Sequence, residues 1–200
     1  MKKPRRLHIL LALGNPGTEY GNTYHNAGVL ALEHMEKSLR PGGPSLDPET
    51  WKSHKKLFEY IAEPQTSGLK TIFIRPLVFM NASGAMAREV LKKFDAEPAD
   101  LTVFHDDSDL PLGKFKIMHG RNSAGHKGVQ SVIDVLGTNG FERVRIGVRS
   151  PVLDAGSREL EAGSHKKAGD FVLSQITPKD RKVLDAVFEE IAEEWAKKKE

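Results

Sequence analysis

The feature that most constrains the fold is an apolar run that ends abruptly in a polar, glycine-bearing loop. Residues 7–13 (LHILLAL) are almost continuously apolar and stop at Gly14, a pattern typical of a strand buried on both faces of an α/β sheet. After the loop, apolar residues recur at spacings of three and four through 26–39, which predicts an amphipathic helix capped by Asn26. The chain therefore begins with a strand, loop and helix unit, and we expect its strand near the centre of a sheet.

The same periodicities predict the remaining elements. We expect strands at 55–63, 70–76, 101–106, 114–118 and 141–148, and helices at 82–94, 127–136 and from Thr177 onward. The first two of these strands form a hairpin, and Asn81 caps the helix that follows them. The polar segment 154–170 is expected to be a mobile surface excursion. The length of 200 residues, without an internal repeat, predicts a single α/β domain over 1–200, with helices flanking a central sheet.

Composition narrows the class of protein. A chain with 38% hydrophobic and 28% charged residues has the balance of a globular domain. It has no cysteine, which excludes disulfides, thiolate metal sites and a cysteine nucleophile, and suits a reducing compartment. Since no apolar run approaches the roughly 18 residues of a bilayer span, and no signal-peptide pattern opens the chain, we expect no membrane association. The formal charge of +3 and the pI near 9.0 are compatible with a nucleic-acid partner.

Three polar clusters follow predicted strands: the loop 15–25, Asn81 and the segment 105–111. Because ligands bind beyond the carboxyl ends of strands in open α/β sheets, we expect these clusters to converge. The chain has no G-x-G-x-x-G, Walker lysine or G-x-S-x-G motif, so a nucleotide cofactor and a serine elbow are disfavoured. Hydrolysis would then use a water activated by a histidine that a carboxylate orients, and His25 with Asp106 is the natural pair.

Two asparagines and the acidic cluster complete the predicted site. Asn15 and Asn81 offer amide donors to a developing oxyanion. Each of these residues also has a plain structural interpretation, as a helix cap or a solvated turn. The acidic segment lacks the spacing of an EF-hand, so we predict no metal site.

The densest basic set of the chain is Lys114, Lys116, Arg121, Lys127, Arg143 and Arg145. Alternation along strands would place several of these side chains on one face, where they could contact phosphates. The alternative is ordinary surface charge.

Five motifs together carry a specific resemblance. GNPGTEYGNTYHNAG, FMNASG, HDDSDLPLGKFK, GHKG and FERVRIGV occur in this order, and over about residues 7–176 the chain resembles the bacterial-type peptidyl-tRNA hydrolases. The resemblance implies a single α/β domain with a mixed twisted sheet and an enzyme that needs no metal or cofactor. Its substrate would be peptidyl-tRNA, whose ester between the peptide and the terminal ribose is cleaved so that the tRNA is recycled in translation.

The resemblance also assigns roles to residues. It implies that His25 is the catalytic base, Asp106 its orienting carboxylate, and Asn15 and Asn81 active-site asparagines. It assigns substrate binding to Tyr20, Met80, His126 and Lys127, and tRNA binding to Lys114, Lys116, Arg143 and Arg145.

This chain departs from the family pattern at two positions of the motifs. Tyr24 stands where the family has arginine in T-R-H-N, and we expect little catalytic consequence. Lys127 stands where the family has the asparagine of H-N-G. Because lysine donates hydrogen bonds but accepts none, we expect retained hydrolysis with altered substrate positioning.

Two other functions stay open at this point. One is a non-catalytic RNA-binding relative, since a plant chloroplast splicing factor resembles this family and a fold can outlive its chemistry. The other is an unrelated small-ester hydrolase, which would leave the basic strand unexplained. We expect a monomer that acts in the bacterial cytoplasm or the mitochondrial matrix.

Overall fold

The computed structural model describes residues 7–39, 51–62, 70–149 and 171–198. The strands in these ranges are β1 (Leu7–Ala12), β2 (Lys52–His54), β3 (Phe58–Ala62), β4 (Lys70–Pro76), β5 (Leu101–Pro111), β6 (Phe115–His119) and β7 (Glu142–Arg149). The helices are α1 (Ala27–Leu39), α2 (Ser83–Phe94), α3 (Lys127–Leu136) and α6 (Pro178–Lys198), with short 3-10 turns η1 (Tyr24–Asn26), η3 (Met80–Ala82) and η4 (Pro98–Asp100). The segment 154–170, for which we expect a mobile excursion, lies outside the described residues.

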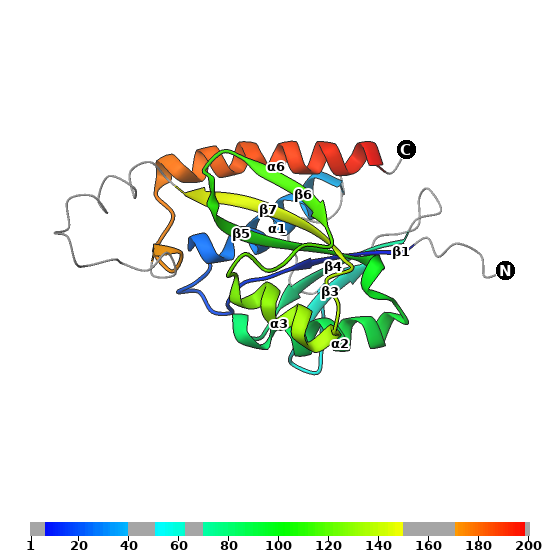
Figure 1. Cartoon of the computed structure of the whole chain (residues 1–200). Helices are drawn as coiled ribbons and strands as arrows, with labels where there is room; N and C mark the ends of the chain where they lie inside the picture. Colours follow the sequence, from blue (N-terminus) through cyan, green and yellow to red (C-terminus); the bar gives the residue numbers. More distant parts are fainter. Residues whose placement is uncertain (1–6, 40–50, 63–69, 150–170, 199–200) are drawn as a thin grey trace, which may run out of the picture.

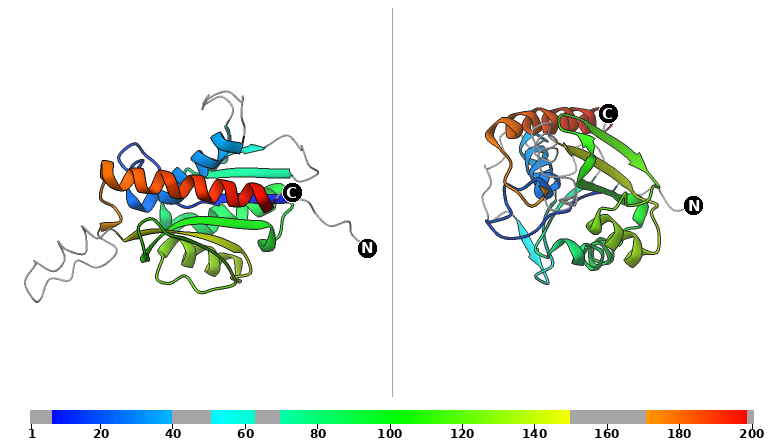
Figure 2. Two further views of the ribbon diagram at one scale, coloured as in Figure 1. Left: turned by 90° about the horizontal axis from the view of Figure 1, so that it is seen from above. Right: turned by 60° about the vertical axis from the view of Figure 1, so that its left-hand side comes forward.

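The strands form one mixed sheet in the order β2-β3-β4-β1-β5-β7-β6. β4, β1, β5 and β7 run parallel, while β3 pairs antiparallel with β4 and β6 antiparallel with β7. Helices α1 and α6 cover one face of the sheet, and α2 and α3 cover the other (Figures 1 and 2). The predicted α/β class, with a mixed sheet flanked by helices, is confirmed.

The first strand lies at the centre of the sheet, as its apolar run predicts. Leu10 and Ala12 pack into the core beneath α1 and α6, whereas Ile9 and Leu11 pack into the core beneath α2 and α3. All four side chains are fully buried, which explains why the run is continuously apolar instead of alternating. The predicted hairpin of β3 and β4 is also confirmed.

Four details differ from the sequence prediction. Neither Asn26 nor Asn81 caps its helix, because each lies inside a 3-10 turn that precedes the α-helix. The strand predicted at 101–106 continues to Pro111. The predicted strand 55–63 begins later, at Phe58, because Lys55 and Lys56 adopt positive φ in a turn after β2.

The parallel strands end at one edge of the sheet, and the polar loops leave from there. Ala12 at the end of β1 is in register with Phe104 of β5, so Asn15 and Asp106 emerge close together. Beyond β4, the chain continues into η3 with Met80 and Asn81. Among the described residues, no helix combines the length and hydropathy that a bilayer span needs.

Candidate active site

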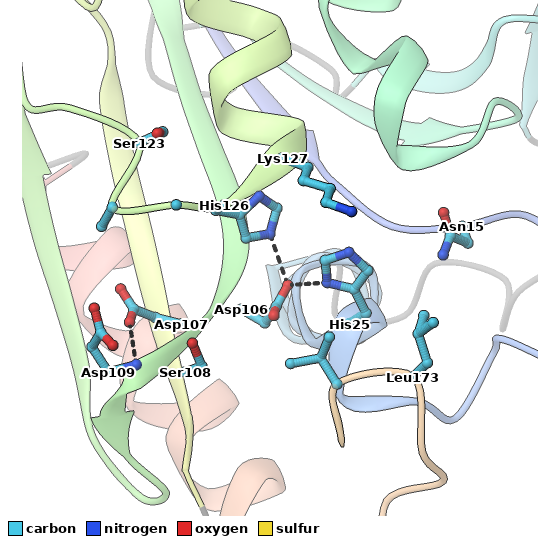
Figure 3. Close-up of a pocket in the computed structure, with 13 residues that line it drawn as sticks. Asn15, His25, Asp106, Asp107, Ser108, Asp109, Ser123, His126, Lys127 and Leu173 are labelled. Atoms are coloured by element: carbon cyan, nitrogen blue, oxygen red, sulfur yellow. Dashed lines mark hydrogen bonds and ion pairs between the residues drawn. The ribbon is translucent and has the colours of Figure 1, made fainter. Parts of the chain in front are cut away.

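A cavity of about 410 Å³ opens at this edge of the sheet (Figure 3). His25, from the turn before α1, and Asp106, from β5, meet inside it: the distance between His25 Nδ1 and Asp106 Oδ1 is 2.8 Å. The structure thus brings together the two residues that sequence reasoning paired. The cavity is lined by Asn15, His25, Asp106, Asp107, Ser108, Asp109, Ser123, Ala124, Gly125, His126, Lys127, Val172 and Leu173.

His126 is a second histidine on the same carboxylate, and its neighbours define its protonation. The backbone N–H of Val129 donates to His126 Nδ1 at 3.2 Å, so that nitrogen carries no proton. His126 Nε2 therefore carries the proton and donates it to Asp106 Oδ1 at 2.9 Å. With the carboxylate accepting from both rings, His25 donates through Nδ1 and keeps Nε2 free as a base. His25 thus has the tautomer that general-base catalysis needs.

Asp106 is the anionic centre of this cluster. It is 3% exposed, and burial by itself would raise its pKa. The neighbouring His126 and His25, which both donate hydrogen bonds to this carboxylate, outweigh burial and hold the pKa of Asp106 well below its usual range. Asp106 is therefore ionised at any working pH and stabilises positive charge on His25.

His105 supports the backbone of Asp106. It is buried, its Nδ1 donates to the backbone carbonyl of Asp106 at 2.7 Å, and its ring meets that of His126 edge-on. Burial, followed by the neighbouring His126, pushes the pKa of His105 well below its usual value. His105 is therefore a neutral support that adds no competing charge.

Asn15 is held rigidly at the cavity wall. Its backbone N–H donates to Asn26 Oδ1 at 2.8 Å, and Asn26 Nδ2 donates back to the Asn15 carbonyl at 3.0 Å. Its side-chain oxygen accepts from the Met80 N–H at 3.0 Å. These bonds leave the Asn15 NH₂ group as the donor available at the cavity. Sequence reasoning treated Asn26 as a cap and missed this locking role, because both uses begin with an asparagine beside a helix.

Asn81 does not share the cavity with Asn15. It is exposed and lines an adjacent pocket of about 500 Å³ beside α3. Ser123, Gly125 and Lys127 border both spaces. The expected convergence of three polar clusters thus holds for two of them, because η3 turns Asn81 away toward α3.

The other two predicted substrate-binding residues flank these spaces without lining them. Met80 is 6% exposed and packs so closely against Gly128 that a Cβ there would lie 2.3 Å from Met80 Sδ. Tyr20 is half-buried and meets the exposed ring of Phe79 edge-on, with centroids 6.1 Å apart.

Tyr24 connects the catalytic loop to α6. Its hydroxyl donates to Asp180 Oδ2 at 2.5 Å, and burial together with Asp180 raises the pKa of Tyr24 to about 12. The backbone next to it is also paired, since the His25 N–H donates to the Val172 carbonyl at 2.7 Å. The turn with His25 and the wall with Val172 and Leu173 therefore form one fixed unit.

The basic residues divide into an accessible and a buried group. Lys114 and Lys116 are exposed, and Arg145 is half-buried in an ion pair with Asp107. Arg143, in contrast, is 1% exposed, and its Nη2 donates to the Asn122 carbonyl at 2.9 Å. The prediction that Arg143 contacts tRNA is corrected: its guanidinium is turned inward, where it supports the 119–126 loop.

A metal ion has a possible set of ligands in this cluster. One ligand atom each from His25, Asp106 and His126 lies within 4.8 Å of the others. Both imidazoles, however, hold protons between themselves and Asp106. A metal would have to displace these protons and free His126 from the Val129 N–H.

Comparison with known proteins identifies the family. The family described as "Peptidyl-tRNA hydrolase" matches residues 9–198. The chain belongs to the bacterial-type peptidyl-tRNA hydrolase family. The peptidyl-tRNA hydrolase of Lactobacillus johnsonii is 35% identical over 92% of this chain and 88% of its own length. That of Aquifex aeolicus is 32% identical over 90% of this chain and 84% of its own.

Solved structures agree in fold. The crystal structure of peptidyl-tRNA hydrolase from Acinetobacter baumannii has a TM-score of 0.74 and 23% identity, covering 96% of this chain and 88% of that one. A peptidyl-tRNA hydrolase in complex with N-propanol has a TM-score of 0.73, also at 23% identity, covering 94% of this chain and 86% of that one. The mixed sheet and its flanking helices are therefore the fold of the hydrolase family.

Proposed function

We propose that this peptidyl-tRNA hydrolase family member cleaves its ester with a water that His25 activates. The observation that carries the proposal is the free Nε2 of His25 in an open cavity, with Nδ1 bound to the ionised Asp106. Nε2 takes a proton from water while the water oxygen bonds to the ester carbonyl carbon. Asp106 stabilises the imidazolium that results, and general-base assistance of this kind is worth roughly 10²–10⁴ in rate.

The tetrahedral intermediate collapses by the reverse proton movement. The bond between the carbonyl carbon and the ribose oxygen breaks, and His25 returns its proton to that oxygen. The products are a peptide carboxylic acid, which loses its remaining proton to solvent and becomes a carboxylate, and a tRNA with a free terminal ribose hydroxyl. The Asn15 NH₂ group, fixed by the bond from Met80 to its oxygen, is suited to stabilise the carbonyl oxygen as it becomes negative.

The charge distribution suggests how the substrate lies. Lys114, Lys116 and Arg145 are on the β6–β7 side of the cavity, where they would contact tRNA phosphates. The pocket with Asn81 lies beside α3 and would receive the peptide near Met80 and Tyr20. The proposal includes a monomer without metal or cofactor, in the cytoplasm or a mitochondrial matrix.

One experiment separates this enzyme from a non-catalytic RNA-binding relative. Hydrolysis of an N-acetylated aminoacyl-tRNA is followed in buffer with a chelator, for the wild type, His25→Ala and His34→Ala. His34 is a matched control, a histidine paired with Glu189 away from the cavity. We expect loss of two to four orders of magnitude in kcat for His25→Ala and an unchanged rate for His34→Ala. A wild type that binds tRNA without cleaving it would support the RNA-binding alternative.

A further inference from the structure

Lys127 stands at the junction of the two spaces that the substrate would occupy. It borders both the catalytic cavity and the pocket with Asn81. Figure 3 shows its side chain extending from the start of α3 toward the space between His25 and Asn15. Within the described part of the chain, its ammonium group has no hydrogen bond or ion pair. Lys127 therefore offers the substrate an ammonium group that pairs directly with no carboxylate of the described residues, although Asp106, Asp109 and Asp134 also line the two spaces.

The position of Lys127 in its helix adds to this charge. It is the first residue of α3, and the first turn of α3 contains no acidic residue. A helix N-terminus is the positive end of the helix dipole, where a cation is unfavourable and an anion is stabilised. The charge of Lys127 and the dipole of α3 therefore both attract an anionic group that lies between the two spaces.

The group that meets Lys127 belongs to the peptide half of the substrate. This step rests on the proposed function, in which Lys114 and Lys116 contact the tRNA. The surface beside α3 is of another kind. The pocket there is lined by the amides of Asn81 and Gln130, by Val135, which is 37% exposed, and by Asp134, whose carboxylate accepts from Gln130 Nε2. Exposed apolar groups mixed with amides suit a peptide better than a phosphate backbone.

Stabilising the oxyanion is already the task of a better-placed donor. Asn15 is locked by Asn26 and Met80, whereas Lys127 is exposed on a flexible four-carbon stem. A preorganised donor stabilises a transition state, while a flexible ammonium pairs with whatever anion comes within reach. The charge of Lys127 is thus available to the side chain of the residue that carries the ester.

We propose that Lys127 makes this hydrolase select peptidyl esters whose ester-linked residue has a carboxylate side chain. Glutamyl and aspartyl esters gain an ion pair at the cavity mouth, and lysyl esters meet repulsion there. Because the site is open to solvent, the preference is moderate, about five-fold in kcat/KM for glutamate over the isosteric glutamine.

The test uses a single tRNA body that carries different residues. N-acetylated glutamate, glutamine and lysine are attached to the same tRNA, so that only the side chain next to the ester changes. The ratio of kcat/KM for glutamate to that for glutamine is measured for the wild type, Lys127→Met, Lys127→Arg and Lys127→Glu. Lys182→Met is the matched control, since Lys182 is an exposed lysine of α6 outside both spaces.

We expect a ratio of about five for the wild type and Lys127→Arg, and close to one for Lys127→Met. Lys127→Glu reverses the order and favours the lysyl ester, while Lys182→Met keeps the wild-type ratio. A wild-type ratio of one, or a preference that survives in Lys127→Met, overturns the proposal. An equal loss for all three esters in Lys127→Met also overturns it, because Lys127 would then act on the phosphate or the carbonyl oxygen common to them.

A binding measurement keeps this result separate from the proposed hydrolysis. The affinity of the His25→Ala protein for the three acylated tRNAs is compared with and without Lys127→Met. A charge-dependent order of affinity that Lys127→Met abolishes supports the selectivity even if no ester is cleaved. Equal affinities alongside normal wild-type hydrolysis refute the selectivity and leave the proposed function intact.

Discussion

His126 and His25 donate to the same oxygen of Asp106, at 2.9 and 2.8 Å. One carboxylate oxygen thereby orients two imidazoles. The hydrogen bond from the Val129 N–H to His126 Nδ1 places the proton of His126 on Nε2, and so leaves His25 to donate through Nδ1. Because both of its ring nitrogens are engaged, by Asp106 and by the Val129 N–H, we propose that His126 acts through Asp106 as a positioning residue. This arrangement makes its contribution separable from that of the base.

The first prediction concerns His126→Phe, which keeps a ring but removes both hydrogen bonds. We expect kcat to fall by about ten-fold, or about 1.4 kcal/mol of transition-state stabilisation, with KM nearly unchanged. Steady-state kinetics on an N-acetylaminoacyl-tRNA measure both constants, and His119→Phe on the exposed end of β6 is the control. A rise in KM without a fall in kcat would instead place His126 in substrate binding.

The same substitution has a consequence for stability at low pH. A carboxylate whose folded pKa is depressed contributes stability above its unfolded value, and that contribution is lost as the pH falls toward the folded pKa. Without the His126 bond the pKa of Asp106 moves up. The stability gap between wild type and His126→Phe should therefore be widest near neutral pH and narrow below about pH 4, around the ordinary value of 3.8. Urea unfolding across this range measures the gap, and a constant gap would refute the linkage.

The raised pKa of Tyr24 predicts that the protein loses stability at alkaline pH. Its pKa is raised from 10.0 to about 12, so the neutral form is the one that folding stabilises. That contribution is fully present below pH 10 and is lost as the pH rises from 10 to 12. Tyr24→Phe should be less stable than wild type at pH 8, with a difference that shrinks by pH 11. Tyr60→Phe, on the remote strand β3, serves as the control, and a difference independent of pH would contradict the assignment.

The accessible basic residues Lys114, Lys116 and Arg145 predict that the affinity for tRNA depends on salt concentration. Lys116 is exposed, so Lys116→Ala should lower the slope of log affinity against log salt for tRNA by about one. Arg143→Met should leave that slope unchanged and instead lower the free energy of unfolding, because Arg143 is buried. Measuring the affinity for tRNA at several salt concentrations distinguishes the roles of the two residues. A lower slope for Arg143→Met would show that its guanidinium reaches phosphate after all.

Close packing predicts the effect of a single methyl group at α3. A Cβ at Gly128 would lie 2.3 Å from Met80 Sδ and 3.1 Å from Leu13 Cδ1, so Gly128→Ala should destabilise the protein by about 1–3 kcal/mol. At Gly21 the nearest atom to an added Cβ is 3.5 Å away, which makes Gly21→Ala the control. Thermal unfolding compares the two, and equal melting temperatures would mean that Met80 rearranges at little cost.

Local pattern predicted the α-helices of this fold and its strands other than β2, the short strand Lys52–His54. The continuous apolar run of β1 predicted a central strand, and the spacing of apolar residues predicted α1 and α3, because burial on two faces or on one stripe leaves a direct mark in the sequence. The turns before α1 and α2 were less predictable. Asn26 and Asn81 carry the same side chain beside a helix, and only the neighbouring chain decides whether that side chain caps, locks a loop or faces a pocket.

By itself, the sequence determined the α/β class, the chemistry available at the strand ends, and the pairing of His25 with Asp106 as an expectation. Only the tertiary structure decided that His126 joins them, that Arg143 turns inward, and that Lys127 stands between two spaces. The physical reason is that period and spacing encode which face of an element is buried, but not what covers it. His25, Asp106 and His126 are far apart in the chain. They acquire shared protons only when the parallel register of β1 and β5, together with the packing of α3, brings them to one edge of the sheet.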